Sequence, residues 1–272
     1  MRPLGVAGRR TTVRRVRLAT WNVNSLGARL PRVEAWLAEM EPDVVCLQET
    51  KLSDTAFPAL AFSALGYESA HVGQGQWNGV AILSRVGIED VVVGFPDDQP
   101  TDPEARLLWA TCAGIRVASM YVPNGRTLAD EQFRYKMAWL GRLRAVLDDL
   151  DPARPLALCG DYNIAPGDDD VWDMAAFEGS THVSPEEREA FAALLAWGLV
   201  DVLRAQHRDP GLYTYWDYRA GSFHKKLGMR IDHILATAPL AERLELVFID
   251  RNARKGTKPS DHTALIACFA DR

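Results

Sequence analysis

Polar side chains that could do chemistry together stand at the ends of apolar runs at six separate places in this 272-residue chain, after the run at four of them and at its start at the other two. Glu49 follows the run 44–47, and Asp161 and Asn163 follow the run 156–159. The other four places hold, in chain order, Asn22 and Asn24, Tyr121 and Asn124, Asp232, and Asp261 with His262. Polar groups at the end of a buried strand are held by a rigid scaffold and yet face solvent, so the six together predict one convergent site.

The donor groups of this set are carboxylates, amides and imidazole, without paired thiols. Hard oxygen ligands suit magnesium, or manganese as the alternative, rather than zinc. Such a cation acts as a Lewis acid and stabilises a leaving alkoxide. In-line attack on a phosphodiester also needs a positioned nucleophile and charge stabilisation on the non-bridging oxygens. The residue types therefore fit metal-dependent phosphoryl chemistry.

Each of these residues, taken alone, also has a purely structural explanation. The explanations are a surface ion pair for Glu49, a turn for Asp161 and Asn163, a helix cap for Asp232, a satisfied core position for His262, and a core aromatic for Tyr121. They do not predict the order in which the motifs follow one another along the chain. The joint pattern therefore favours the functional interpretation.

Short apolar runs separated by turn residues predict about ten strands. These runs are residues 16–21, 44–47, 79–83, 107–112, 115–121, 156–159, 199–203, 231–236, 244–249 and 264–269. Helical spacing of apolar residues predicts helices over 30–40 and 130–150. A third helix is expected to begin after Ser184, with Pro185 in its first turn and Glu187 closing a capping box.

This alternation of strands and helices predicts an α/β fold with two sheets packed face to face and helices outside. No repeat or long linker interrupts the sequence, which predicts one domain over residues 15–272. The first twenty residues carry six arginines and no acidic residue. We interpret residues 1–14 as a disordered basic extension, either a DNA-touching tail or an over-extended start of the gene.

Composition is that of an ordinary globular protein, with 47% hydrophobic and 25% charged residues. No apolar run approaches the roughly 18 residues that span a bilayer, and the basic N-terminus lacks the apolar core of a secretion signal, so a cytoplasmic protein without membrane contact is expected. Nothing in the sequence demands more than a monomer. The cysteines lie apart in apolar runs without a CxxC pair, which predicts buried thiols at Cys46, Cys112, Cys159 and Cys268.

The net charge of -5 argues against a protein coated in positive charge, but a local basic face is compatible with it. There are two candidate clusters, each of which could equally be ordinary solvated surface. The first comprises His224, Lys225, Lys226 and Arg230, and the second comprises Arg251, Arg254, Lys255 and Lys258.

Six motifs in order, WNVNSL, LQETK, YVPNG, GDYNIAP, RIDHIL and SDH, resemble those of exonuclease III and the major abasic endonucleases. That family belongs to the endonuclease/exonuclease/phosphatase superfamily, and the resemblance covers about residues 15–270. It implies a DNase I-like, four-layered α/β sandwich of two mixed sheets flanked by helices. It also implies magnesium-dependent hydrolysis 5′ to abasic sites in duplex DNA, with 3′–5′ exonuclease and 3′-end-cleaning activity.

The resemblance implies a metal shell around one carboxylate. Glu49 of LQETK is expected to be the principal metal ligand, with Asn22, Asn24 and Asp261 completing or orienting the shell. Asp161 of GDYN is expected to activate the attacking water, although this residue is assigned to metal in some readings of the family.

The remaining positions of the motifs are expected to handle the phosphate. Asn163 would bind it and help to hold the water, with metal ligation as the alternative role. His262, oriented by Asp232, would donate to a phosphate oxygen, and His262 is also a candidate metal ligand. Tyr121 would support the phosphate or the leaving group, with Asn124 nearby.

The segment before Asp232 resembles the abasic-pocket region of the DNA repair branch. By that alignment Tyr215 or Trp216, together with Met229 and Ile231, would line a small apolar pocket for a flipped sugar that lacks its base. Met229 departs from some relatives, which have Trp there. A core strand rich in aromatic residues is the structural alternative.

Duplex DNA with abasic sites or damaged 3′ ends is the expected partner, and Arg126 and the cluster around Lys225 could contact its phosphates. Two other functions stay open. One is an inositol-phosphate or lipid phosphodiesterase or phosphatase on the same scaffold, and the other is a DNA-binding module that has lost catalysis.

Overall fold

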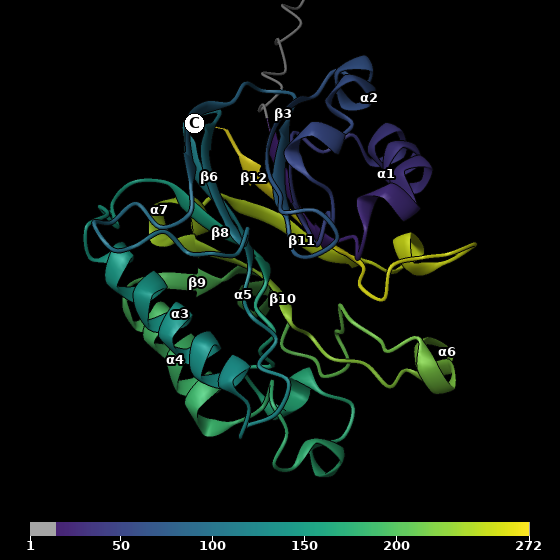
Figure 1. Cartoon of the computed structure of the whole chain (residues 1–272), viewed down its shortest axis with the longest axis vertical. Helices are drawn as coiled ribbons and strands as arrows, with labels where there is room; N and C mark the ends of the chain where they lie inside the picture. Colours follow the sequence, from purple (N-terminus) through teal and green to yellow (C-terminus); the bar gives the residue numbers. More distant parts are fainter. Residues whose placement is uncertain (1–14, 272) are drawn as a thin grey trace, which may run out of the picture.

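Two six-stranded sheets pack face to face in residues 15–271, which are the residues that the computed structural model describes (Figure 1). The first sheet has the order β11 (Leu244–Asp250), β12 (Ala264–Ala270), β1 (Arg15–Asn22), β2 (Val44–Gln48), β4 (Val80–Ser84) and β3 (Glu68–Val72). The second has the order β5 (Glu89–Val93), β6 (Leu107–Cys112), β7 (Ile115–Tyr121), β8 (Leu156–Asp161), β10 (Asp232–Thr237) and β9 (Leu199–Asp201).

Alternating side chains in the strands produce the layers. In β1, Val16 and Leu18 join the core between the two sheets, whereas Ala19 and Trp21 pack toward helix α1 (Leu26–Met40) on the outer face. Helix α2 (Ala59–Ala64) covers the same outer face, and α3 (Glu131–Leu147) and α4 (Pro185–Ala196) cover the second sheet (Figure 1). The four-layered sandwich of mixed sheets expected from the sequence is confirmed.

Short helices occupy the connections. They are α5 (Val202–Gln206), α6 (Ser222–Lys225) and α7 (Ala238–Ala241), with the 3₁₀ turns η1 (Asp54–Ala56), η2 (Asp168–Asp170), η3 (Met174–Phe177), η4 (Arg219–Gly221) and η5 (Arg251–Arg254). Helix α4 begins as predicted, because Ser184 Oγ accepts from the Glu187 amide and the Glu187 carboxylate accepts from the Ser184 amide. In the described part of the chain, no helix is both long and apolar enough to cross a bilayer.

Some sequence expectations differ from the structure. The edge strands β3 and β5 were not predicted, because β3 is only partly buried, β5 is mostly exposed, and charged or small residues interrupt both. The predicted strand 199–203 is wrong beyond Asp201, whose carboxylate accepts from the Leu203 and Arg204 amides and so begins α5. The four thiols are buried and free, as expected. The predicted extension 1–14 lies outside the described residues.

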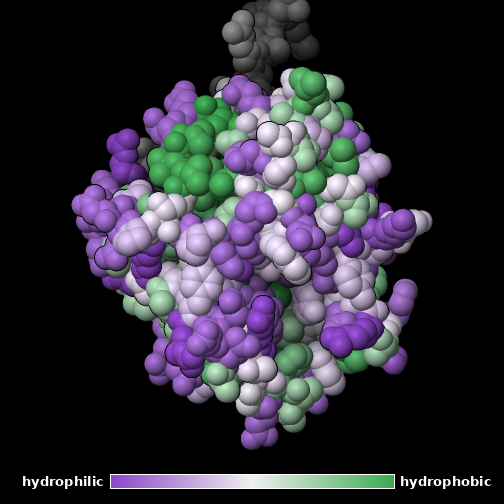
Figure 2. Space-filling view, viewed as in Figure 1, coloured by the Kyte–Doolittle hydropathy of each residue, from purple (hydrophilic) through white to green (hydrophobic). Residues whose placement is uncertain are grey.

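The two basic clusters are smaller than the sequence suggested. Arg230 is only 1% exposed and forms ion pairs with Asp170 and Asp201, so it is not part of a surface cluster. Arg254 is also buried. His224, Lys225 and Lys226 of the first cluster and Arg251, Lys255 and Lys258 of the second are exposed. Hydrophilic residues cover much of the face shown in Figure 2, including the part over α6.

Strand pairing gathers the candidate residues at one end of the sandwich. The parallel pair β1/β2 sets Asn22 beside Gln48, the residue before Glu49. In the second sheet, Asp161 is the register partner of Tyr121 on one side and of Asp232 on the other. The pairing therefore accounts for the convergence that the polar strand ends predicted.

Gly160 allows β7 and β8 to approach closely just before Asp161. A Cβ atom at this position would lie 2.0 Å from the carbonyl oxygen of Met120, its register partner. We expect Gly160→Ala to cost about 3 kcal/mol of unfolding free energy, because a backbone clash within a paired sheet cannot relax through side-chain rotation. Urea unfolding would measure it. Gly141→Ala in α3, where a Cβ would meet open space, is the control, and it should be neutral or stabilising.

Candidate active site

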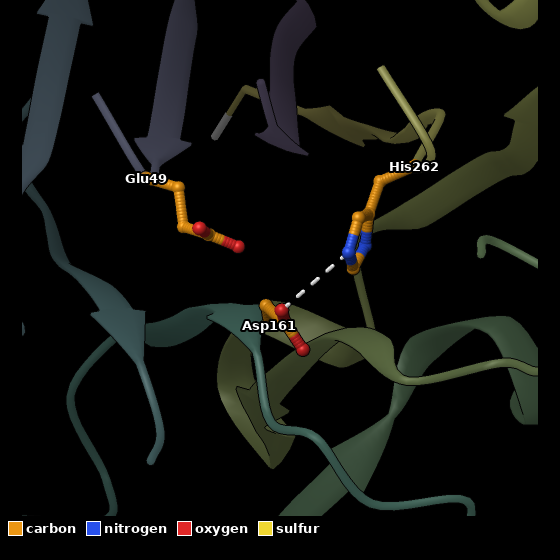
Figure 3. A group of neighbouring side chains, drawn as sticks. All are labelled: Glu49, Asp161 and His262. Atoms are coloured by element: carbon orange, nitrogen blue, oxygen red, sulfur yellow. Dashed lines mark ion pairs between the residues drawn. The ribbon is translucent and has the colours of Figure 1, made fainter. Parts of the chain in front are cut away.

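Glu49, Asp161 and His262 meet at the end of the sandwich where strands of both sheets finish. Figure 3 shows their side chains pointing toward one another, and one ligand atom from each lies within 4.8 Å of the others. Glu49 directly follows β2, Asp161 is the last residue of β8, and His262 precedes β12. Residues far apart in the sequence thus form one cluster.

Asn22 joins the carboxylates of the two sheets. Its side-chain Nδ2 donates to Glu49 Oε1 at 2.8 Å and to Asp161 Oδ2 at 2.9 Å. The Asn22 Oδ1 accepts from the Asn24 amide at 2.9 Å, which fixes the orientation of the group. Asn22 therefore orients the two carboxylates, and its Oδ1 keeps a second lone pair that could face a cation.

His262 is held as a cation. Its Nδ1 lies 2.8 Å from Asp232 Oδ2, and its Nε2 lies 3.7 Å from Asp161 Oδ2. Burial opposes the charge, but the carboxylates of Asp232 and Asp161 prevail and raise the pKa of His262 to about 10. The Nε2 proton therefore points into the site at neutral pH.

Asp161 has the opposite electrostatic problem. Burial raises its pKa to about 7, a shift to which nearby Asp232 adds, while the charge of His262 and hydrogen bonds from Asn163 and Asn22 oppose it. A carboxyl group with a pKa near neutrality is suited to accept a proton during a reaction.

Tyr121 stays a neutral phenol. Burial raises its pKa well above the ordinary value, and the carboxylates of Glu49 and Asp161 add to the shift. The guanidinium of Arg106 lies 4.6 Å from the centre of the Tyr121 ring and donates to the Tyr121 carbonyl at 3.1 Å. The ring is thereby fixed against the site. Sequence reasoning missed Arg106, which no motif marks.

Two amides complete this side of the cluster. Asn124 Nδ2 donates to Asn163 Oδ1 at 3.0 Å, and Asn163 Nδ2 donates to the Val122 carbonyl at 3.0 Å. The Asn163 backbone amide donates to Asp161 Oδ1 at 2.9 Å. Asn163 and Glu49 both have φ values of 51°, in the left-handed region, and such conformations persist only where the surroundings impose them. Arg126 is exposed beside Asn124.

The oxygen donors fit a hard divalent cation. Glu49 and Asp161 face one another within ligand distance of a shared point, as magnesium or manganese would require. Lys51 Nζ lies 2.9 Å from Glu49 Oε2, leaving Oε1 on the side of Asp161. His262 belongs to the same group of possible ligand atoms, so it stays a candidate ligand through a neutral Nε2 as well as a candidate donor when it is protonated.

Asn24 and Asp261 form a separate pair at the edge of this cluster. Asn24 Nδ2 donates to Asp261 Oδ1 at 3.0 Å, and Lys51 Nζ donates to Asn24 Oδ1 at 2.6 Å. Asp261 is not part of the carboxylate and imidazole group within 4.8 Å. The structure therefore places these two residues where they could orient the cluster from one side.

A cavity of about 350 Å³ opens next to the cluster. Tyr215 and Met229 line it, and the ring of Tyr215 lies 4.9 Å from that of His262. Ile231 is buried in the apolar group behind Met229. Trp216 is 1% exposed and packs against Phe223, so of the two sequence alternatives the structure places Tyr215, not Trp216, on the cavity wall.

The cavity has a further wall, formed by residues outside the six sequence motifs. Its residues come from the segment between η2 and α4, and they are Trp172, Ala176, Phe177, Ser180, Thr181 and His182. His182 has a φ of 78°, and its Nδ1 lies 2.6 Å from the Asn163 carbonyl oxygen. Burial and the charge of Lys136 lower the pKa of His182 to about 4, so the imidazole is neutral at neutral pH.

The fold and the site together define a class of hydrolytic enzymes built on two packed β-sheets flanked by helices. In this class, carboxylates, amides and an imidazole converge where the two sheets end. The chain belongs to the endonuclease/exonuclease/phosphatase family, whose model matches residues 19–262.

Individual relatives agree over nearly the whole length. Exodeoxyribonuclease III of Haemophilus influenzae is 33% identical over 270 residues, covering 93% of this chain and 100% of that protein. A 3′ phosphatase from Neisseria, solved with a product DNA hairpin, has a TM-score of 0.91 at 41% identity and covers 94% of this chain and 100% of its own. An AP endonuclease from Archaeoglobus fulgidus has a TM-score of 0.90 at 41% identity, covering 93% and 99%.

Proposed function

We propose that the protein is a DNA repair nuclease of the exonuclease III type. It hydrolyses the phosphodiester 5′ to abasic sites in duplex DNA, and it removes nucleotides and blocking groups from 3′ ends. The observation that carries this proposal is the joining of Glu49 and Asp161 by Asn22 opposite the Asp232–His262 pair. The activities for which the relatives are named, those of an exodeoxyribonuclease, a 3′ phosphatase and an AP endonuclease, support the choice of substrate.

The side chains divide the work of an in-line displacement. Asp161 accepts the proton of the attacking water, and Asn163 and Asn124 hold that water and a non-bridging oxygen. His262 donates a hydrogen bond from Nε2 to a phosphate oxygen, and the Tyr121 hydroxyl donates a hydrogen bond to the leaving oxygen. Glu49 would hold magnesium, or manganese, which supplies positive charge to the phosphate and the leaving oxygen when bound.

The cavity beside His262 is the proposed place for a sugar that lacks its base. Tyr215 and Met229 give it an apolar wall, and the neutral His182 adds a polar edge. A flipped abasic sugar needs less room than an intact nucleotide. Arg126, Lys225 and Lys226 are exposed and are proposed to contact DNA phosphates without reading sequence. The cytoplasmic location and the monomeric state stay predictions.

Cleavage of three labelled DNA duplexes tests the proposal. The duplexes carry an internal abasic site, a 3′-phosphate or an unmodified recessed 3′ end. We expect magnesium-dependent cleavage at the abasic site and at the 3′ ends, and loss of all activity with a chelator, because charge stabilisation on the phosphate depends on the cation. Quantified product bands give the three rates.

The same preparation should leave inositol phosphates and sphingomyelin intact. Turnover of either of these, together with indifference to all three duplexes, would replace the nuclease with a phosphatase or lipid phosphodiesterase. Metal-dependent binding of the duplexes without cleavage would instead point to a module that has lost catalysis.

A further inference from the structure

A fully buried ion pair connects α3 to α4 behind the active site. The side chains of Lys136 and Glu187 are both 0% exposed, and Lys136 Nζ donates to Glu187 Oε1. Burial would raise the pKa of Glu187, but the Lys136 ammonium and several hydrogen bonds lower it, so the carboxylate is charged. Neither residue belongs to the motifs that the sequence assigned to catalysis.

Lys136 reaches the backbone of both active-site amides. Besides Glu187, its ammonium donates to the Asn163 carbonyl at 2.7 Å and to the Asn124 carbonyl at 3.4 Å. Asn163 adopts a left-handed φ of 51°. One buried cation thus fixes the two peptide units whose side chains bond to each other in the site.

Glu187 fixes the neighbouring cavity wall in the same way. Its Oε1 accepts from Thr181 Oγ1 at 2.7 Å and from the His182 amide at 2.9 Å. The Asn124 carbonyl oxygen lies 3.1 Å from the same Thr181 Oγ1, so the single hydroxyl proton is shared between Glu187 and Asn124. The cavity wall and the amides are therefore attached to the same ion pair.

A contribution to stability does not by itself explain such a pair. Desolvating two charges costs about as much as their attraction returns, and apolar replacements of similar volume are often neutral or stabilising. Each charge here is, however, aimed at backbone groups that border the cavity and the carboxylates. An apolar pair would fill the space but would remove these bonds, leaving the Asn163 carbonyl with His182 alone and the Asn124 carbonyl with Thr181 alone.

We propose that Lys136 and Glu187 are positioning residues that hold Asn163, Asn124 and the cavity wall in the geometry needed for phosphodiester hydrolysis. The inference rests on the proposed nuclease function. It assigns Lys136 chiefly to the rate of the chemical step, through Asn163 and Asn124. It assigns Glu187 to both the chemical step and substrate binding, because Glu187 also holds Thr181 and His182.

Single-turnover and steady-state cleavage of the abasic duplex test the proposal with Lys136→Met, Lys136→Arg and Glu187→Gln. We expect Lys136→Met to lower kcat by about tenfold to a hundredfold with less than about a threefold change in KM, since small displacements of positioned groups have effects of this size. Lys136→Arg, which keeps the charge and the donors, should recover most of kcat. Glu187→Gln should lower kcat and also raise KM.

Control variants remove an exposed ion pair from the same helix. Glu131→Gln and Arg134→Gln alter side chains that are 91% and 68% exposed, and wild-type kinetics are expected. All assays run at a temperature where circular dichroism shows each variant folded. A purely structural role would lower Tm and leave kcat and KM of the folded enzyme unchanged, and that result would overturn the inference.

Thr181→Val keeps the test decisive if Lys136→Met does not fold. It removes one donor to both Glu187 and the Asn124 carbonyl with little change of shape, so we expect kcat to fall by about threefold to tenfold. Wild-type kcat in both Thr181→Val and Glu187→Gln would overturn the proposal. A wild-type enzyme that cleaves no DNA would instead remove the proposed function, and this inference with it.

Discussion

Replacing Asp161 by Asn is expected to lower the rate of metal-dependent DNA cleavage by about a thousandfold, which is within the usual contribution of a positioned proton acceptor. An amide cannot take the proton of the attacking water. The bond from the Asn163 amide should survive, because Oδ1 of Asn can still accept it, whereas the bond from Asn22 Nδ2 to Oδ2 is lost. Single-turnover cleavage of the abasic duplex at saturating magnesium would measure the loss.

Asp169→Asn is the matched control, since Asp169 is an exposed carboxylate in the segment that follows β8. Its rate should equal that of the wild type. The variant Asp161→Asn should also bind the uncleaved duplex about as well as the wild type, or somewhat better, because a buried negative charge has been removed. A wild-type cleavage rate in Asp161→Asn would assign the activation of water to another residue.

Asp232→Asn is expected to move the alkaline limit of activity to lower pH. The protonated form of His262 is the donor, and Asp232 is the strongest charge that raises its pKa to about 10. Without that carboxylate the pKa should fall toward the ordinary value of about 6.5, so kcat/KM at about pH 9 should drop by about a hundredfold. The pH profile of kcat/KM from about pH 6 to pH 9.5 would show the shift.

The effect on stability has the same sign. The pKa of His262 in the folded protein lies above its ordinary value, so the Asp232–His262 pair adds stability below about pH 6.5 and loses it as the pH rises through about 10. The exposed variant Asp209→Asn should leave both the pH profile and the stability unchanged. An unaltered alkaline limit in Asp232→Asn would mean that another group donates to the phosphate.

The convergence of the site could be predicted from the sequence because its residues sit at strand ends. Short runs of buried apolar residues mark strands such as β2 and β8 directly, and Glu49 follows β2 at once while Asp161 ends β8. The edge strands β3 and β5 lack this signal, since strands at the edge of a sheet are only partly buried and tolerate charge.

Contacts between distant loops could not be predicted in this way. Arg230 looks like a member of a basic surface cluster, and only tertiary packing turns it toward Asp170 and Asp201. Tyr215 and Trp216 are adjacent and both aromatic, so composition could not decide which ring faces the cavity. His182 lies in an irregular segment without periodicity. The hydrogen bond that connects it to the active site is with the backbone carbonyl of Asn163, which no sequence pattern indicates.

The side-chain amide of Asn22 bridges the two sheets, because it bonds to Glu49 at the end of the first sheet and to Asp161 at the end of the second. The apolar core between the two sheets therefore sets the distance between the Glu49 and Asp161 carboxylates. A second polar contact also joins the two sheets, since Gln48 Nε2 donates to Ser119 Oγ at 3.2 Å. Substitutions that change the volume of this core, although they lie far from the DNA, should alter the turnover rate before they unfold the protein.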